Sequence, residues 1–360
     1  MSVAAISSRV DAYAPPRSGY AVDLRLDANE GRRPPAELLA GAAAQAAWNV
    51  QRYPTTARLE EVLAARLGMD APRVVVTAGG DDALDRVCRA FLAPGRRAVT
   101  TSPTFEMIPR AARAAGAMVT EVPWWDGPFP VGDVVRSIDE AVSVIFVVTP
   151  NNPTGSVATA EDVRMIAEAA PGAVVCVDLA YTEYAAVDLT TVVLSLPNVV
   201  VVRTLSKAWG LAGLRVGYAA GNAGLIDALR AAGGPYPASA LSLEVAAAWL
   251  GAGEAFMRES VSIVRAERTA MAVLLPERGV GVIDSQANFI LARFADADEA
   301  WEIADALARR HGIGVRRFPR DGALENRLRI SCPCDAEAFA RLRRGLGDVL
   351  SPSRSKGVTP

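Results

Sequence analysis

The chain has 360 residues, a formal net charge of −2 at pH 7 and a sequence pI near 5.7. This length suits two compact units, because single hydrophobic cores stop growing near roughly 250 to 300 residues. The absence of a basic excess in the sequence argues against nucleic acid or an acidic membrane surface as partner, so we expect a small-molecule ligand.

The first 35 residues contain two proline pairs and no clear helical periodicity. We predict that residues 1–35 form an extended arm, which packs on the smaller domain or on a neighbouring subunit. The sequence shows no secretory signal pattern and no apolar run of the roughly 18 residues that a bilayer requires. Its four cysteines lack zinc-type spacing. These features predict a cytoplasmic protein with no metal site and no membrane partner.

Apolar, β-branched runs alternate with helical periodicity from residue 36 to about residue 250. The runs are VVVT (74–77), AVTTS (98–102), VSVIFVV (142–148), AVVCV (173–177) and NVVVV (198–202). Continuous apolar strands separated by helices predict an α/β fold whose mostly parallel central sheet carries helices on both faces. We assign residues 36–264 to this large domain and expect the loops at the carboxyl ends of its strands to build the site.

The pattern changes after a long amphipathic stretch. Short strands then alternate with two helices, and the strands are ANFILARF (287–294), IGVRR (313–317) and RLRISC (327–332). This pattern predicts a smaller α+β domain over residues 265–350, followed by a flexible tail over residues 351–360.

The strand ends carry residues whose chemistry is unusual for their position. Lys207 is one of two lysines among 38 basic residues. Unlike arginine, a desolvated lysine amine can lose its proton and attack a carbonyl, as Schiff-base formation requires. Asp178 ends a strand predicted to be buried, so its carboxylate needs a cation from another element or from a ligand. Gly79 and Gly80 lie between a strand and a helix, where backbone amides bind a phosphate or form an ordinary helix cap.

Ten short motifs follow one another over nearly the whole chain. They are LDANEG (26–31), RYP (52–54), AGGDD (78–82), SPTF (102–105), TPNNPTG (149–155), VDLAY (177–181), RTLSKAWGLAGLRVGY (203–218), PYP (235–237), ANFILARF (287–294) and RLRIS (327–331). In this order they resemble the pyridoxal-phosphate (PLP) aminotransferases of fold type I, and most of all the histidinol-phosphate aminotransferase group. The resemblance implies the PLP-dependent transferase fold, a homodimer, an amino donor such as glutamate and an oxo acceptor in amino-acid biosynthesis.

The same resemblance implies roles for individual residues. Lys207 is expected to form the Schiff base with PLP and to move the proton during transfer, and Asp178 to pair with the ring nitrogen. The other expected cofactor contacts are Gly80, Asp81, Thr204, Ser206 and Arg215 at the phosphate, Asn152 and Tyr181 at the phenolic oxygen, Phe105 on the ring face, and Tyr53 from the partner subunit.

For the substrate, the resemblance implies a carboxylate-binding Arg329 and an Arg316 that faces the distal group. Arg317 beside it is able to exchange roles with Arg316. Asn29 of the LDANEG motif is a further candidate for the substrate site, and Tyr20 could line an aromatic pocket.

The chain departs from the family pattern at Leu179, which stands where the usual D-E-A-Y motif has glutamate. Two other activities share nearly all of these motifs: an aromatic or specialised-metabolism aminotransferase and a phospho-amino-acid decarboxylase. A PLP-dependent regulator would need an additional DNA-binding domain. A nicotinamide-dependent enzyme would need G-x-G-x-x-G after its first strand, and the sequence lacks it there.

Overall fold

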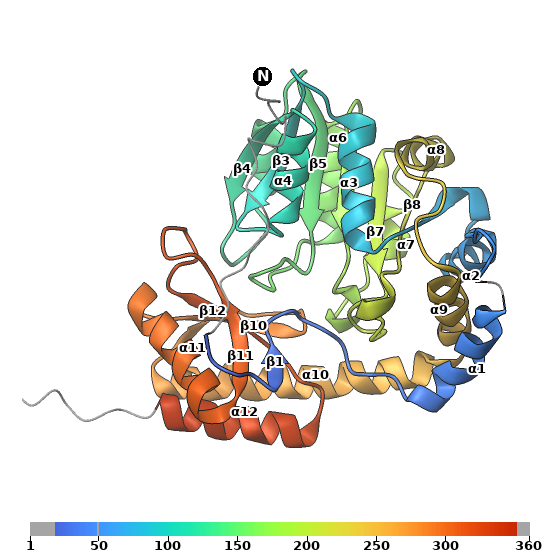
Figure 1. The fold of residues 1–360 in the computed structure, drawn as a ribbon. Helices are drawn as coiled ribbons and strands as arrows, with labels where there is room; N and C mark the ends of the chain where they lie inside the picture. Colours follow the sequence, from blue (N-terminus) through green and yellow to red (C-terminus); the bar gives the residue numbers. More distant parts are fainter. Residues whose placement is uncertain (1–18, 49, 351–360) are drawn as a thin grey trace, which may run out of the picture.

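The computed structural model describes residues 19–48 and 50–350 of the chain. It contains a large mixed sheet covered by helices and a smaller sheet with its own helices. The large sheet lies above the smaller one in Figure 1. The predictions for the first 18 residues of the arm and for the tail at 351–360 lie outside the described residues.

The large sheet has seven strands within the described residues, in the order β2-β8-β7-β6-β5-β3-β4. Strand β8 runs antiparallel to both of its neighbours, and the other adjacent pairs are parallel. The strands are β2 (Val74–Thr77), β3 (Arg97–Ser102), β4 (Met118–Pro123), β5 (Val142–Val148), β6 (Val174–Asp178), β7 (Val199–Thr204) and β8 (Gly217–Gly221).

Both faces of this sheet are buried, which explains its continuous apolar runs. Successive side chains of a strand point to opposite faces. In β5, Ile145 and Val147 therefore join one core cluster, while Val144 and Phe146 join the other. Helices α2, α5, α6, α7 and α9 contribute buried residues to the first cluster, and α3, α4 and α8 to the second.

The helices of the large domain begin before its first strand and then mostly alternate with the strands along the chain. They are α1 (Ala36–Ala47), α2 (Ala57–Leu67), α3 (Gly80–Phe91), α4 (Met107–Ala114), α5 (Val131–Arg136), α6 (Ala160–Ala169), α7 (Thr190–Val193), α8 (Ala223–Ala232) and α9 (Ala240–Ala252). Local sequence fixes several of their starts. At α6, for example, Thr159 and Asp162 form a reciprocal capping box.

The small domain is built on a sheet in the order β1-β11-β12-β10-β9. Its strands are β1 (Leu24–Leu26), β9 (Gly281–Val282), β10 (Phe289–Arg293), β11 (Ile313–Arg317) and β12 (Arg327–Ser331), and its helices are α11 (Ala297–His311) and α12 (Ala336–Val349). Strand β1 belongs to the predicted N-terminal arm and pairs in parallel with β11. The arm thus contributes an edge strand to a sheet made by the other end of the chain.

The long helix α10 (Glu254–Leu274) connects the two domains, along the bottom of Figure 1. The predicted boundary between residues 264 and 265 falls inside this continuous helix. In the described part of the chain, no single helix is both long and apolar enough to cross a membrane. Only α9 taken together with the segment from α10 to Arg278, a pair bent by 78°, has the length and composition of a span.

Candidate active site

A cavity of about 480 Å³ lies at the carboxyl ends of the parallel strands, with residues of both domains in its wall. It brings together residues predicted from motifs up to 300 positions apart. The predicted residues that line it are Asn29, Gly80, Asp81, Phe105, Asn152, Asp178, Tyr181, Thr204, Ser206, Lys207, Arg215, Arg316 and Arg329.

Hydrogen-bond donors gather on one side of the cavity, where α3 begins. Gly79 has a φ of 83°, a backbone conformation that suits glycine, and α3 starts at Gly80 with its free amides directed outward. The Arg215 guanidinium reaches this turn and pairs with Asp81 at 3.2 Å. A Cβ added at Gly79 would lie 2.6 Å from Nη2 of Arg215. The turn therefore leaves space for a close approach of the arginine to an anion on the helix terminus.

The hydroxyl groups at the end of β7 extend the same anion-binding surface. Thr204 donates to the Ser206 hydroxyl at 2.9 Å, and Ser206 lies 3.5 Å from Nη1 of Arg215. Backbone amides, two hydroxyls and a guanidinium thus converge as a phosphate group requires.

Asp178 lies at the end of β6 and is only 5% exposed. Its carboxylate accepts a hydrogen bond from the backbone of Ala180 at 3.0 Å, and no described side chain forms an ion pair with it. Burial, with a smaller contribution from the nearby Asp81, raises the pKa of Asp178 to about 7 against the lowering effects of the Ala180 bond and of Lys207. A cationic ligand such as a protonated ring nitrogen would provide the missing partner.

Lys207 follows β7 and reaches across the cavity. Its Nζ donates to the backbone oxygen of Ala28 at 3.1 Å and lies 5.7 Å from the ring centre of Tyr181. The arm packs closely against this loop, because a Cβ at Gly31 would lie 1.7 Å from the backbone oxygen of Lys207. The Tyr181 hydroxyl accepts a hydrogen bond from Asn29 at 3.1 Å. The arm therefore holds both the amine and the phenol in place.

The two candidate substrate arginines enter the cavity from the small domain. Arg329 on β12 donates to Oδ1 of Asn152 at 2.6 Å and to the backbone oxygen of Asp27 at 2.7 Å. Arg316 on β11 lines the cavity, whereas Arg317 pairs with Asp305 at 2.9 Å and stacks on Trp301. Adjacent residues of a strand face opposite sides, so the structure favours Arg316 over Arg317 as the cavity residue.

Two predicted site residues lie away from this cavity. Tyr53, in the segment between α1 and α2, is 80% exposed and stacks on Tyr236 with 4.4 Å between ring centres. Tyr20 is exposed, with the Arg309 guanidinium 5.8 Å from its ring. Neither residue lines the cavity. That Tyr53 reaches a partner's site stays a prediction.

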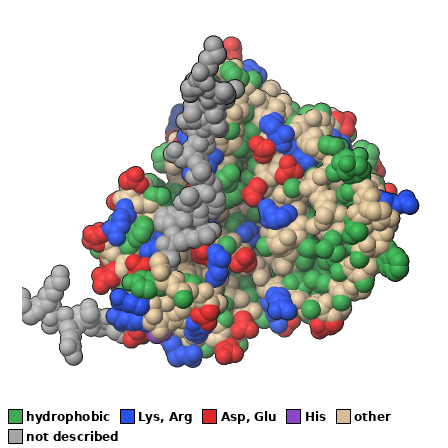
Figure 2. Space-filling view, viewed as in Figure 1, with side chains coloured by type: hydrophobic (Ala, Val, Ile, Leu, Met, Phe, Trp, Pro, Cys, Tyr) green, Lys and Arg blue, Asp and Glu red, His purple; other side chains and the backbone are tan. Residues whose placement is uncertain are grey.

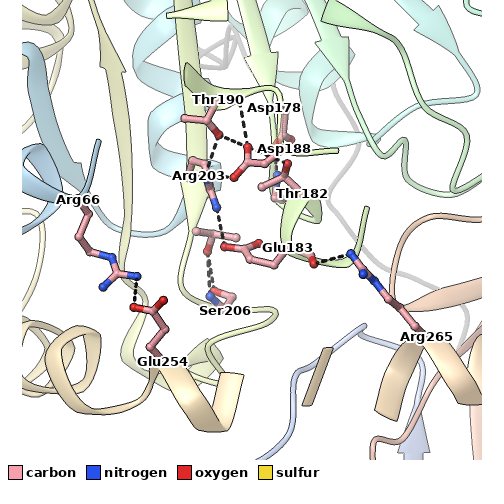
Figure 3. Close-up of polar contacts among 12 residues, drawn as sticks. Arg66, Asp178, Thr182, Glu183, Asp188, Thr190, Arg203, Ser206, Glu254 and Arg265 are labelled. Carbon is pink, nitrogen blue, oxygen red and sulfur yellow. Dashed lines mark hydrogen bonds and ion pairs between the residues drawn. The ribbon is translucent and has the colours of Figure 1, made fainter. Parts of the chain in front are cut away.

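A buried polar network lies on the face of β7 opposite to Thr204, which lines the cavity (Figure 3). Arg203 donates to Glu183 at 2.6 Å and to Thr190 at 2.7 Å. Since Arg203 precedes the Lys207 loop and Glu183 follows Tyr181, these bonds fix the two loops relative to each other. Sequence reasoning missed this network, although the charged residues beside the VDLAY and LSK motifs were a visible signal.

Two further features were not predicted. Glu106, directly before α4, pairs with Arg316 at 2.6 Å, and nothing in the local sequence connects residues 210 positions apart. Leu179 is fully buried in the core of the large domain. Its place in that core provides a packing role for the residue that departs from the family motif.

These groups fit pyridoxal phosphate. The anion-binding turn at Gly79 suits its phosphate, the buried carboxylate of Asp178 suits its ring nitrogen, and Lys207 suits its aldehyde. Among the described residues, no cluster of three or more histidine, cysteine or carboxylate side chains could hold a metal ion.

The sequence profile of the family "Aminotransferase class I and II" matches residues 23–346. A histidinol-phosphate aminotransferase from Paracoccus denitrificans is 35% identical, covering 91% of this chain and 89% of its own. An aromatic amino acid aminotransferase from Mycobacteroides abscessus is 33% identical, covering 94% of this chain and 96% of its own. The crystal structure of histidinol-phosphate aminotransferase from Sinorhizobium meliloti in complex with pyridoxal-5'-phosphate has a TM-score of 0.83 at 26% identity and covers 91% of each chain. The predicted fold class is confirmed.

Proposed function

Because the chain belongs to the class I and II aminotransferases, we propose that it transfers an amino group from glutamate to imidazole-acetol phosphate, which forms histidinol phosphate. The observation that carries this proposal is the cavity in which Lys207, Asp178 and the Gly79 turn meet. These are the groups that a PLP-dependent transaminase needs at the aldehyde, the ring nitrogen and the phosphate of its cofactor.

The cofactor is pyridoxal 5'-phosphate, whose ring accepts electrons from the substrate carbon that loses its proton. Asp178 holds the ring nitrogen in its cationic form, and the Gly80 amide, Ser206 and Arg215 bind the phosphate. The Lys207 amine moves the proton, because a base within reach of both reacting carbons is needed in each half of the reaction.

The remaining lining residues orient the ring and the substrate. Asn152, Tyr181 and Phe105 line the cavity. In this proposal the first two hold the phenolic oxygen of the cofactor, and Phe105 packs on the face of its ring. Arg329 binds the α-carboxylate of glutamate with the planar, two-pronged geometry that a guanidinium offers.

A second candidate function is transamination of aromatic amino acids. The relative from Mycobacteroides abscessus supports it, since it matches over nearly the same length of chain as the histidinol-phosphate enzymes do. The ion pair between Glu106 and Arg316 supports it as well, because it balances the charge of the arginine that would otherwise attract a distal anion.

A homodimer is part of this proposal and rests on an exposed apolar surface. Large apolar side chains gather around α1, α9 and the loops next to them, on the right-hand side of Figure 2. The exposed residues in this region are Leu38, Trp48, Val50, Tyr53, Tyr236 and Leu241. Contiguous patches of this kind mark protein interfaces, and a partner seated here would bring Tyr53 towards the neighbouring cofactor.

A cytoplasmic location also stays a proposal, supported by four free, buried cysteines.

The test is a half-reaction, followed by a comparison of acceptors. Glutamate alone should remove the visible absorbance of the lysine-bound cofactor, and imidazole-acetol phosphate should restore it with a higher kcat/KM than phenylpyruvate. The opposite preference would replace the first candidate by the second. Failure of every amino acid to change the spectrum would refute transamination and leave decarboxylation as the activity to test.

A further inference from the structure

An ion pair between the two domains forms part of the site on the substrate side. Arg316 projects from β11 of the small domain into the cavity, and Glu106 directly precedes α4 of the large domain. Nη2 of Arg316 and Oε1 of Glu106 are 2.6 Å apart. The Arg316 side chain is 10% exposed and that of Glu106 is 42% exposed, so the arginine is fixed in the wall while the carboxylate faces solvent.

The buried guanidinium needs an anionic partner, and two anions compete for it. A guanidinium binds carboxylates and phosphates through the same planar set of donors. A distal carboxylate or phosphate of a substrate would therefore have to replace Glu106 on Arg316. The carboxylate has a second cation nearby, since Arg110 lies 3.9 Å from its other oxygen one helical turn further along α4. Glu106 can thus leave Arg316 without losing all cationic contact.

We propose that Glu106 is a specificity-determining residue: it occupies on Arg316 the place of the substrate's distal anion, so that acidic substrates bind by exchange. This inference rests on the proposed function, because it takes Arg316 as the partner of the distal group. Substrates with a neutral, aromatic side chain leave the ion pair intact and pack against it. Glu106 thereby lowers the affinity for acidic substrates relative to aromatic ones.

The test compares two ligands that cannot react. Glutarate has a distal carboxylate and 3-phenylpropanoate has a neutral ring, and calorimetry measures the Kd of each for the PLP-loaded enzyme. With Glu106→Gln, we expect glutarate to bind about tenfold more tightly and 3-phenylpropanoate to change by less than about twofold. Glu106→Asp, one methylene shorter, should give an intermediate change.

Two further variants separate this exchange from a general effect of charge. Glu168→Gln removes an exposed carboxylate that is also paired with an arginine, on α6, and should leave both Kd values unchanged. In the Arg316→Gln background, glutarate should bind about tenfold more weakly than to the native enzyme, and Glu106→Gln should then have no further effect.

The inference is overturned if Glu106→Gln changes the two affinities by the same factor, leaves that of glutarate unchanged, or acts equally strongly without Arg316. These measurements need no turnover, so they are separate from the test of transamination. If the enzyme fails the half-reaction with glutamate but Glu106→Gln changes the ratio of the two Kd values as expected, the proposed function is refuted and the exchange is retained. If transamination is normal and Glu106→Gln leaves the ratio of the two Kd values unchanged, only the exchange is refuted.

Discussion

Replacing Asp178 by asparagine should stabilise the cofactor-free protein at alkaline pH. Burial raises the pKa of this carboxyl from its ordinary value of 3.8 to about 7. A folded-state pKa above the unfolded value means that the folded protein binds the proton more tightly, so its stability falls as pH rises between these values. The difference of about three pH units corresponds to about 4 kcal/mol at full ionisation. Asparagine keeps the shape of the side chain and removes this cost.

The assay is guanidinium unfolding of the cofactor-free protein at several pH values. The free energy of unfolding of Asp178→Asn, relative to the native protein, should rise by about 3 kcal/mol between about pH 5 and pH 8. Asp85→Asn, at a half-exposed carboxylate that is paired with an arginine, should show no comparable rise. With cofactor bound, Asp178→Asn should instead be less stable than the native protein, because asparagine cannot hold the ring nitrogen cationic. PLP should therefore dissociate from the variant more readily. A difference independent of pH, or a loss of stability at pH 8, would refute the reasoning about burial.

Three further substitutions test the rest of the site. Lys207→Arg keeps the charge but cannot form a Schiff base, so the visible absorbance and the turnover should both disappear; near-native turnover would exclude Lys207 as the reacting amine. Gly79→Ala places a Cβ against Arg215 at a positive φ, and the Kd for PLP should rise at least about tenfold, equivalent to about 1.4 kcal/mol; an unchanged Kd would mean that the turn is not the phosphate site. Arg203→Leu leaves Glu183 as a buried, unpaired charge and should lower the free energy of unfolding by about 3 to 5 kcal/mol, whereas Arg203→Leu combined with Glu183→Leu should recover part of the loss.

The sequence was most informative where chemistry and backbone geometry coincide in a short segment. Asp178 could be singled out because a carboxylate at the end of a buried strand conflicts with its surroundings, and Lys207 because lysine is so rare in this chain. Arg316 and Arg317 could not be separated without the strand orientation, since a shift of one residue exchanges the two faces.

The interactions that the sequence did not predict are those that depend on how the domains meet. Glu106 gains its importance from a contact across 210 positions of the chain. A glutamate at a helix start is also common in its own right, because its charge interacts favourably with the helix dipole. The network around Arg203 was missed for a related reason, because Arg203 on β7, Glu183 after β6 and Thr190 at the start of α7 meet only in the folded domain.

The pairing of β1 with β11 also determines when the site is completed during synthesis. Leu24 pairs with Ile313, so the arm emerges from the ribosome long before the strand that holds it. At about 5 to 20 residues per second, the interval between them is on the order of 15 to 60 s. Until then, the segment at Gly31 that packs against the Lys207 loop lacks the strand pairing that anchors the arm to the small domain. The large domain can thus fold around a reactive lysine whose cover is translated first and is docked last.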